Sequence, residues 1–224
     1  MSDQTTNQVI EVIGFDLDNT LYHSTPEIQK RIRGEIYVNL SHKLGVSLKE
    51  ATRLFEENYE SDNPWGHSGT RTIQELARRY GKDLNGSDIV QSALEHSNIL
   101  DLIDPNPKLV DMLGKLGKGR SLDLLTGSKY NIAVKKLEKI GIPVQIFEYI
   151  LSAEERGSKS DGKLYTHWLE LREIPSYKIL YVGDNERQDI LPAKEFGIRT
   201  CIVRNKSKEA DYQINDILEL ESIL

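Results

Sequence analysis

Aspartates follow two of the apolar segments of the chain at the point where each segment ends. Asp16 and Asp18 come directly after Val9–Phe15, and Asp184 comes shortly after Lys178–Val182. Asp16 and Asp18 are two residues apart, so on an extended chain their side chains lean to one side. Clustered carboxylates repel one another unless a cation neutralises them, and oxygen ligands without His or Cys favour a hard ion such as Mg²⁺. A carboxylate can also act as a nucleophile, so the pattern indicates metal-assisted chemistry.

Hydroxyl groups and a lysine follow the apolar segments that lie between these two. Thr126 and Ser128 come after Ser121–Leu125, and Lys159 comes after Ile146–Leu151. In an open parallel sheet, ligands bind beyond the carboxyl ends of the strands. Taken alone, each acid more often caps a loop or starts a turn than carries chemistry. Because acids, hydroxyls and a lysine all follow apolar strands, the combination favours a functional site.

The elements that must position these residues read as alternating strands and helices. Strands are predicted at Val9–Phe15, Ser121–Leu125, Ile146–Leu151, Lys178–Val182 and Thr200–Val203, with helices at Tyr130–Ile140, Lys163–Glu173 and Arg187–Phe196. This alternation is typical of a parallel sheet with helices on both faces. We therefore expect an α/β fold with a Rossmann-like, five-stranded parallel sheet. The tail Asp211–Leu224 is expected to form a last helix.

The stretch after the first strand reads as helix only. Its helical patterns are Glu27–Gly45, Leu48–Tyr59, Gly69–Tyr80 and Ser87–Ser97. A connection between two parallel strands needs one helix, so several helices in succession predict an inserted all-helical cap. The expected boundaries place residues 1–21 and 104–224 in the core and residues 22–103 in the cap.

Composition excludes several classes of protein. The 224 residues carry a net charge of −6, are 38% hydrophobic and contain no block of Lys and Arg. Nucleic acid polymers and anionic membranes are therefore poor candidates as main partners. A single cysteine, Cys201, rules out an intrachain disulfide and suits a reducing compartment. With no signal peptide and no apolar stretch long enough to span a membrane, we expect a cytoplasmic protein. The expected oligomeric state is a monomer or a homodimer.

Four segments together resemble a known superfamily. The run Phe15-Asp16-Leu17-Asp18-Asn19-Thr20-Leu21 resembles the D-x-D-x-T signature of the haloacid dehalogenase-like (HAD) superfamily. Thr126, the segment from Ser152 to Tyr165 with Lys159, and the segment from Gly183 to Asp189 resemble its second, third and fourth motifs, in order. The helical insert between the first and second motifs resembles the subfamily with a helical cap, subfamily I. Ser160 and Gly162 depart from the third motif, which usually has prolines there.

The resemblance implies Mg²⁺-dependent hydrolysis of phosphomonoesters through an aspartyl-phosphate. It makes Asp16 the nucleophile and Asp18 the acid that protonates the leaving group and then the base towards water. Mg²⁺ would be held by Asp16, the Asp18 backbone and Asp184, with Asp189 orienting Lys159 or a metal-bound water. Phosphoryl oxygens would contact Thr126, Lys159 and the backbone after Thr126, whereas Thr20 would brace the loop. The expected substrate-side residues of the core include Thr20, Gly127 and Ser128.

A weaker resemblance concerns the substrate. Tyr59, Gly69-Thr70 and Pro105-Asn106-Pro107 resemble the pyrimidine 5′-nucleotidase branch. Three residues are expected to contact substrate: Tyr22, Trp65 by stacking on a base, and Arg71 by meeting a second anionic group. Trp65 could instead belong to the cap core.

The expected partner is a small phosphorylated metabolite. A nucleoside 5′-monophosphate, with a pyrimidine preferred, is the leading candidate. The alternatives are a sugar or other small-metabolite phosphatase, a phosphomutase, and an inactive scaffold of the superfamily.

Overall fold

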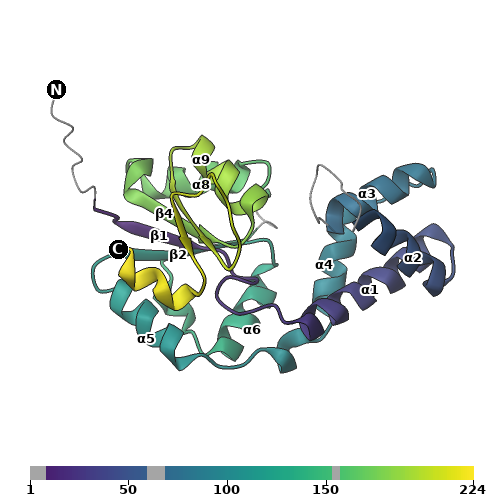
Figure 1. Cartoon of the computed structure of the whole chain (residues 1–224), viewed down its shortest axis with the longest axis horizontal. Helices are drawn as coiled ribbons and strands as arrows, with labels where there is room; N and C mark the ends of the chain where they lie inside the picture. Colours follow the sequence, from purple (N-terminus) through teal and green to yellow (C-terminus); the bar gives the residue numbers. More distant parts are fainter. Residues whose placement is uncertain (1–8, 60–68, 153–156) are drawn as a thin grey trace. The chain divides into compact units, whose positions relative to one another are not determined.

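The computed structural model describes residues 9–59, 69–152 and 157–224, and the chain divides into two compact units. The first comprises Met1–His23 and Ile103–Leu224, and the second comprises Ser24–Leu102. Figure 1 labels the elements of both units along the chain.

The first unit is built on a six-stranded sheet with the order β3-β2-β1-β4-β5-β6. All neighbouring strands pair in parallel. The strands are β1 (Val12–Phe15), β2 (Ser121–Thr126), β3 (Tyr149–Ser152), β4 (Ile179–Gly183), β5 (Arg199–Val203) and β6 (Tyr212–Ile214). The predicted parallel α/β fold is confirmed, and β1 lies between β2 and β4, so their carboxyl ends are neighbours.

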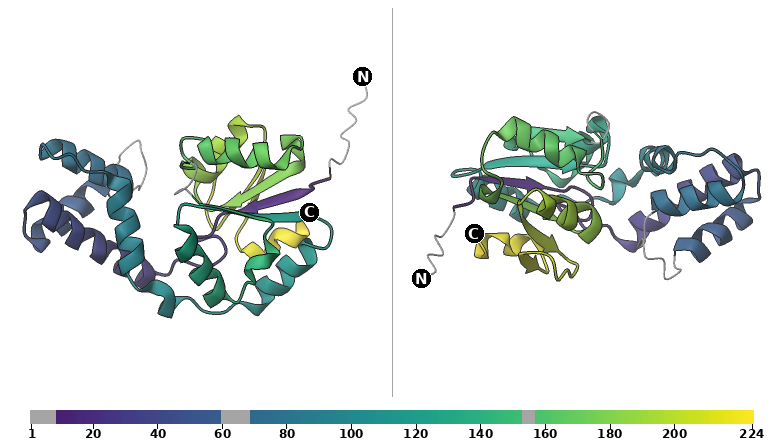
Figure 2. Two further views of the ribbon diagram at one scale, coloured as in Figure 1. Left: turned by 180° about the vertical axis from the view of Figure 1, so that it is seen from behind. Right: turned by 90° about the horizontal axis from the view of Figure 1, so that it is seen from above.

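Helices cover both faces of this sheet. Figure 2 shows α5 (Pro107–Leu116) and α6 (Tyr130–Ile140) on one side, and α8 (Lys163–Arg172) and α9 (Leu191–Glu195) on the other. Beneath α8, the fully buried rings of Tyr165, Trp168 and Tyr181 form the centre of one hydrophobic cluster. Short 3-10 turns occur at Val144–Ile146, Ser176–Lys178 and Ile217–Ser222, and a π-helical turn occurs at Glu186–Ile190.

Several parts of the first unit differ from the sequence-based expectation. The predicted helix Arg187–Phe196 begins as the π-helical turn and continues as α9, and the predicted strand Ile146–Leu151 is replaced by a 3-10 turn followed by β3. The tail does not form an α-helix: Tyr212–Ile214 pairs with β5 as a sixth strand, and Ile217–Ser222 is a 3-10 helix. The carboxylate of Asp211 accepts hydrogen bonds from the backbone and hydroxyl of Thr200, which ties this strand to the edge of the sheet. Helix α5 was not expected, although it has a clear start: Asn106 caps the Leu109 N–H and Pro107 follows.

The second unit is helical and has its own core. It contains α1 (Pro26–Leu44), α2 (Leu48–Tyr59), α3 (Gly69–Arg79), α4 (Gly86–His96) and a 3-10 turn at Ile99–Leu102. Helix α1 begins where Thr25 caps the Ile28 N–H and ends at Gly45, whose φ of 71° is in the left-handed region. Leu40, Phe55, Ile73, Leu76 and Ala93 are buried together at its centre. Within the described ranges of both units, no helix combines the length and the apolar character that crossing a membrane requires.

Candidate active site

The carboxyl ends of the central strands carry the residues that the sequence singled out. Asp16 directly follows β1, and its N–H donates to the carbonyl of Val182 in β4 at 2.9 Å. Thr126 ends β2 beside Ser152 at the end of β3, and Asp184 directly follows β4. The strand register therefore places chemically active side chains from separate parts of the chain at one edge.

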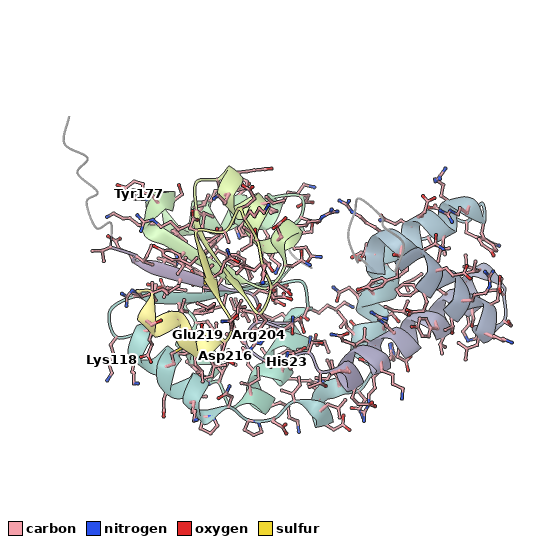
Figure 3. All side chains as sticks on the ribbon, viewed as in Figure 1. His23, Lys118, Tyr177, Arg204, Asp216 and Glu219 are labelled. Carbon is pink, nitrogen blue, oxygen red and sulfur yellow. The ribbon has the colours of Figure 1, made fainter. Side chains whose placement is uncertain are left out.

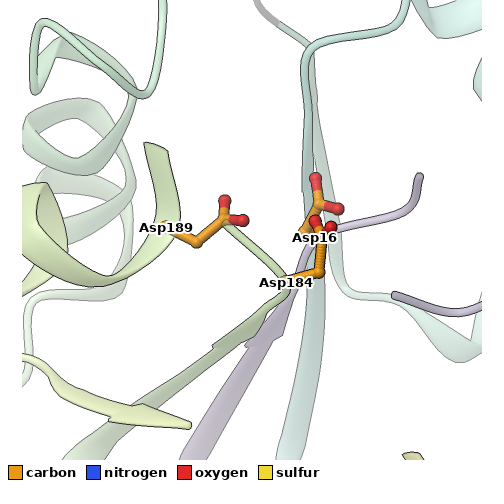
Figure 4. Close-up of side chains that lie close together, drawn as sticks. All are labelled: Asp16, Asp184 and Asp189. Atoms are coloured by element: carbon orange, nitrogen blue, oxygen red, sulfur yellow. The ribbon is translucent and has the colours of Figure 1, made fainter. Parts of the chain in front are cut away.

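Three carboxylates converge at this edge. Asp16, Asp184 and Asp189 each offer one oxygen, and these oxygens lie within 4.8 Å of one another (Figure 4). Asp16 is 5% exposed and Asp189 is 1% exposed, so water screens their charges poorly. An oxygen-only donor set of this kind fits a hard divalent cation such as Mg²⁺.

Lys159 supplies positive charge inside the same cluster. Its Nζ lies 2.5 Å from Asp16 Oδ1 and 2.6 Å from Asp189 Oδ1. The second oxygen of Asp189 accepts from the Asn185 N–H at 2.9 Å, so both oxygens of Asp189 have protein donors. Lys163, a neighbouring lysine in the sequence, is 72% exposed and pairs with Asp161 instead.

Two carboxyls of the cluster, those of Asp16 and Asp184, have a raised pKa when no cation is bound. Burial raises the pKa of Asp16 to about 8, assisted by the charges of Asp189, Asp184 and Asp18 and opposed by Lys159. Burial and the charge of Asp189 likewise raise the pKa of Asp184 to about 6, opposed by a hydrogen bond from Asn19. Like charges held this close cost free energy unless protons or a cation neutralise them.

These raised pKa values predict a pH-dependent stability of the metal-free protein. A carboxyl with a raised pKa keeps its proton in the folded chain after the unfolded chain has released it, so stability falls as pH rises through that interval. For Asp16 the interval runs from its ordinary pKa of 3.8 to about 8, and for Asp184 from 3.8 to about 6. Thermal melting with EDTA should therefore show a falling melting temperature between pH 5 and 8, and the increase on adding Mg²⁺ should be larger at pH 8 than at pH 5. A Mg²⁺-induced increase that is the same at both values would contradict this account.

Asp18 lies apart from that triad and has its own set of donors. Tyr22 Oη donates to Asp18 Oδ1 at 2.5 Å, and Ser128 Oγ donates to Oδ2 at 2.9 Å. Lys136 Nζ lies 2.5 Å from Oδ1. Burial favours the neutral carboxyl, but the charge of Lys136 and the hydrogen bonds from Lys136, Tyr22 and Ser128 outweigh it and lower the pKa of Asp18.

The loop that carries Asp16 and Asp18 is held from several directions. Thr20 is fully buried, and its hydroxyl donates to Asp16 Oδ2 at 3.0 Å. Asn19 has a φ of 59°, a left-handed conformation that Asn tolerates better than most residues, and its amide donates to Asp184 Oδ2 at 2.7 Å. Arg204, labelled in Figure 3, donates to the backbone carbonyls of Asn19 and Thr20 at 2.7 and 2.9 Å. These contacts join the loop to the ends of β4 and β5.

The end of β4 requires a glycine at position 183 for a steric reason. A Cβ atom at this position would lie 2.4 Å from Cγ of Asp189 and 2.5 Å from its Cβ. Any larger residue would push Asp189 away from Lys159 and Asn185. The absence of a side chain at Gly183 therefore allows the turn that carries Asp189 to fold back against β4.

The remaining residues that were predicted to contact substrate lie in both units of the chain. Thr126 is fully buried, and its Oγ1 accepts from the Ser128 N–H at 3.0 Å, while Gly127 between them is exposed. Tyr22 is 8% exposed and bound to Asp18. Arg71 is an exposed residue of α3 in the second unit, and Trp65 lies outside the described residues.

Lys136 and Arg204 are charged residues that contact the site and that the sequence analysis missed. Lys136 carries a detectable signal, because it shares the buried face of α6 with Ala133, Leu137 and Ile140, where an apolar residue is expected. Arg204 also carries a detectable signal, because it directly follows β5, just as Asp16 follows β1 and Asp184 follows β4.

Comparisons with known proteins agree with this geometry. The family model for the haloacid dehalogenase-like hydrolases matches residues 10–197. The chain is 26% identical over 226 residues to a glyceraldehyde 3-phosphate phosphatase of Methanocaldococcus jannaschii, covering 96% of this chain and 97% of the relative. It is 27% identical over 205 residues to the 5-amino-6-(5-phospho-D-ribitylamino)uracil phosphatase of Escherichia coli, covering 87% and 84%.

A solved structure has the same fold. The crystal structure of a HAD phosphatase from Thermococcus onnurineus superposes with a TM-score of 0.65 at 24% identity, covering 95% of this chain and 97% of that chain. The family match spans the motif-bearing loops after β1, β2, β3 and β4, whose side chains converge in the structure. The chain therefore belongs to the haloacid dehalogenase-like hydrolase family.

Proposed function

We propose that this protein is a Mg²⁺-dependent phosphatase that hydrolyses small phosphomonoesters through a phosphorylated Asp16. The observation that carries the proposal is the setting of Asp16. One of its oxygens is bound by Lys159 and the other by Thr20, and Asp184 and Asp189 lie beside it. A buried, rigidly held carboxylate next to a lysine suits attack on a phosphorus atom that carries negative oxygens.

In the first half-reaction, an Asp16 oxygen bonds to phosphorus and the ester P–O bond breaks. The leaving oxygen takes a proton from the protonated form of Asp18, which lies two residues along the same loop. In the second half-reaction, Asp18 takes a proton from a water molecule as that water attacks phosphorus, and the bond to Asp16 breaks. The proton that Asp18 gains in the second step replaces the one it gave in the first, so each turnover is balanced.

The residues of the cluster divide the remaining tasks. Asp16, the Asp18 backbone and Asp184 are the candidate ligands of Mg²⁺, which when bound supplies positive charge beside the phosphoryl oxygens. Asp189 orients Lys159, because both of its oxygens already accept from protein donors. The Thr126 hydroxyl and the Lys159 ammonium are the candidate donors to the phosphoryl oxygens.

The relatives favour a particular class of substrate. The two relatives named above are phosphatases of glyceraldehyde 3-phosphate and of a 5-phosphoribitylamino compound. Both substrates carry phosphate at the end of a short hydroxylated carbon chain. We propose that this class, sugar and polyol phosphates, contains the substrate of this protein. A nucleoside 5′-monophosphate also carries its phosphate on a terminal sugar carbon, and the pyrimidine preference stays a prediction.

A panel of phosphate esters at fixed Mg²⁺ separates these substrates. We expect triose, pentose and polyol phosphates to be hydrolysed with higher kcat/KM than UMP, CMP, AMP and GMP. The measurement is inorganic phosphate release at matched, subsaturating concentrations, with p-nitrophenyl phosphate as the reference ester. If UMP or CMP exceeds every sugar phosphate by tenfold or more, the nucleotidase prediction replaces the sugar-phosphate proposal, and the phosphatase proposal stands.

A further inference from the structure

Lys136 is a completely buried lysine that the chemistry above does not use. Its side chain is 0% exposed, and it lies on the face of α6 that also buries Ala133, Leu137 and Ile140. Lys135 and Lys139, on the same helix, are exposed. Burying an ammonium group costs free energy unless a charged or polar partner compensates for the lost hydration. The residues that contact Lys136 Nζ therefore indicate the role of this lysine.

The partner is the carboxylate of Asp18, which Lys136 contacts both directly and through a hydroxyl. Lys136 Nζ lies 2.5 Å from Asp18 Oδ1 and 2.9 Å from Ser128 Oγ. Ser128 Oγ donates in turn to the other oxygen, Oδ2, at 2.9 Å. Both oxygens of Asp18 are thus fixed by one ammonium group and the hydroxyl that it contacts.

The two buried lysines of the site serve different acids. Lys159 contacts Asp16 and Asp189, and Lys136 contacts Asp18. The Asp18 side chain keeps 35% exposure while Lys136 has none, so the lysine approaches from the protein interior and leaves the accessible part of the carboxylate uncovered.

We propose that Lys136 is a positioning residue that holds the Asp18 carboxylate where it can take the proton from the attacking water. This inference rests on the proposed phosphatase function and adds a residue to it. Without Lys136, Ser128 and Tyr22 would still contact Asp18, but the charged donor on Oδ1 would be gone. The half-reaction in which Asp18 acts as base should then slow, while phosphorylation of Asp16 by an ester with a good leaving group should continue.

Lys136→Met tests the proposal, because methionine fills a similar volume without charge. With p-nitrophenyl phosphate, we expect rapid mixing to show a burst of about one equivalent of p-nitrophenolate, followed by a steady-state rate at least about tenfold below that of the unaltered protein. Acid quenching should trap more phosphorylated protein than in the unaltered protein. Lys135→Met and Lys139→Met are matched controls on the exposed side of α6 and should leave rate and trapped phosphoprotein unchanged.

Two further variants separate positioning from a general loss of structure. In an Asp18→Asn background, Lys136→Met should change the dephosphorylation rate by less than about twofold, since its effect acts through Asp18. Lys136→Gln, which keeps a neutral donor, should show the same slowed step even if the methionine variant does not fold, with thermal melting used to verify folding.

Two results would overturn the proposal. The first is a folded Lys136→Met or Lys136→Gln variant with the rate and trapped phosphoprotein of the Lys135→Met control. The second is a full additional loss from Lys136→Met in the Asp18→Asn background. Failure of the phosphatase function itself is distinguishable, because the unaltered protein would then form no phosphorylated intermediate.

Discussion

Asp16→Asn is expected to lower kcat for phosphate-ester hydrolysis by at least roughly a thousandfold, the scale seen when a nucleophile is removed. The amide has nearly the same shape as the carboxylate, so the loss would come from chemistry. It is a poor nucleophile, and it brings no negative charge to Lys159, which lies 2.5 Å from Asp16 Oδ1. The rate of p-nitrophenyl phosphate hydrolysis and acid trapping of the phosphorylated protein together test this expectation.

A matched control for this variant is available in the third motif. Asp161 is a partly exposed aspartate, paired with Lys163 outside the carboxylate cluster, so Asp161→Asn should leave kcat nearly unchanged. Thermal melting of both variants would verify that they fold. If Asp16→Asn kept more than a tenth of the activity of the unaltered protein, the covalent mechanism would be wrong.

Removal of divalent cations is expected to have the second largest effect. The oxygens of Asp16, Asp184 and Asp189 lie within 4.8 Å of one another, and burial leaves the charges of Asp16 and Asp189 poorly screened. Loss of a Lewis acid beside the phosphoryl group costs several kcal/mol of transition-state stabilisation, so chelation should reduce the rate by about a hundredfold or more. Mg²⁺ should restore it, whereas Ca²⁺ should bind and inhibit, because its larger and looser coordination misplaces the nucleophile.

The contribution of one candidate Mg²⁺ ligand, Asp184, can be measured separately. Asp184→Asn should raise the Mg²⁺ concentration needed for half-maximal activity, and Asp161→Asn should not. Binding can be followed independently of turnover by the melting shift that Mg²⁺ produces. Full activity after exhaustive treatment with EDTA would rule out the metal requirement.

The sequence was most informative where burial and function act on the same short segment. Strands buried on both faces must be continuous apolar runs, and polar residues directly after them must lie at the carboxyl edge of the sheet. This pattern predicts Asp16, Thr126 and Asp184 at the carboxyl edge, with Lys159 in the segment after the third strand. Helix α6 has the predicted bounds, because Gly141 provides a clear stop.

Other parts depended on contacts between distant segments, which local patterns do not encode. The tail Asp211–Leu224 has a helical pattern, but its first residues pair with the edge of β5. The role of Lys136 depends on Asp18, which lies 118 residues away in the chain and accepts its hydrogen bond. The residues next to Lys136 in the sequence do not indicate this contact. Arg204 reaches the carbonyls of Asn19 and Thr20 across a separation of more than 180 residues.

The direct pairing of β1 with β2 has a consequence for how this family can diversify. Val12 to Phe15 lies in register with Ser121 to Leu124, although the whole helical unit is inserted between the two strands in the chain. The site contacts described above are all made by residues of the first unit, and the helical unit has a hydrophobic core of its own. Substitutions, insertions or exchange of that unit can thus accumulate without altering the reacting groups. The groups gathered at the carboxyl edge of the sheet can therefore be kept while one contiguous stretch of the gene, which encodes Ser24–Leu102, changes.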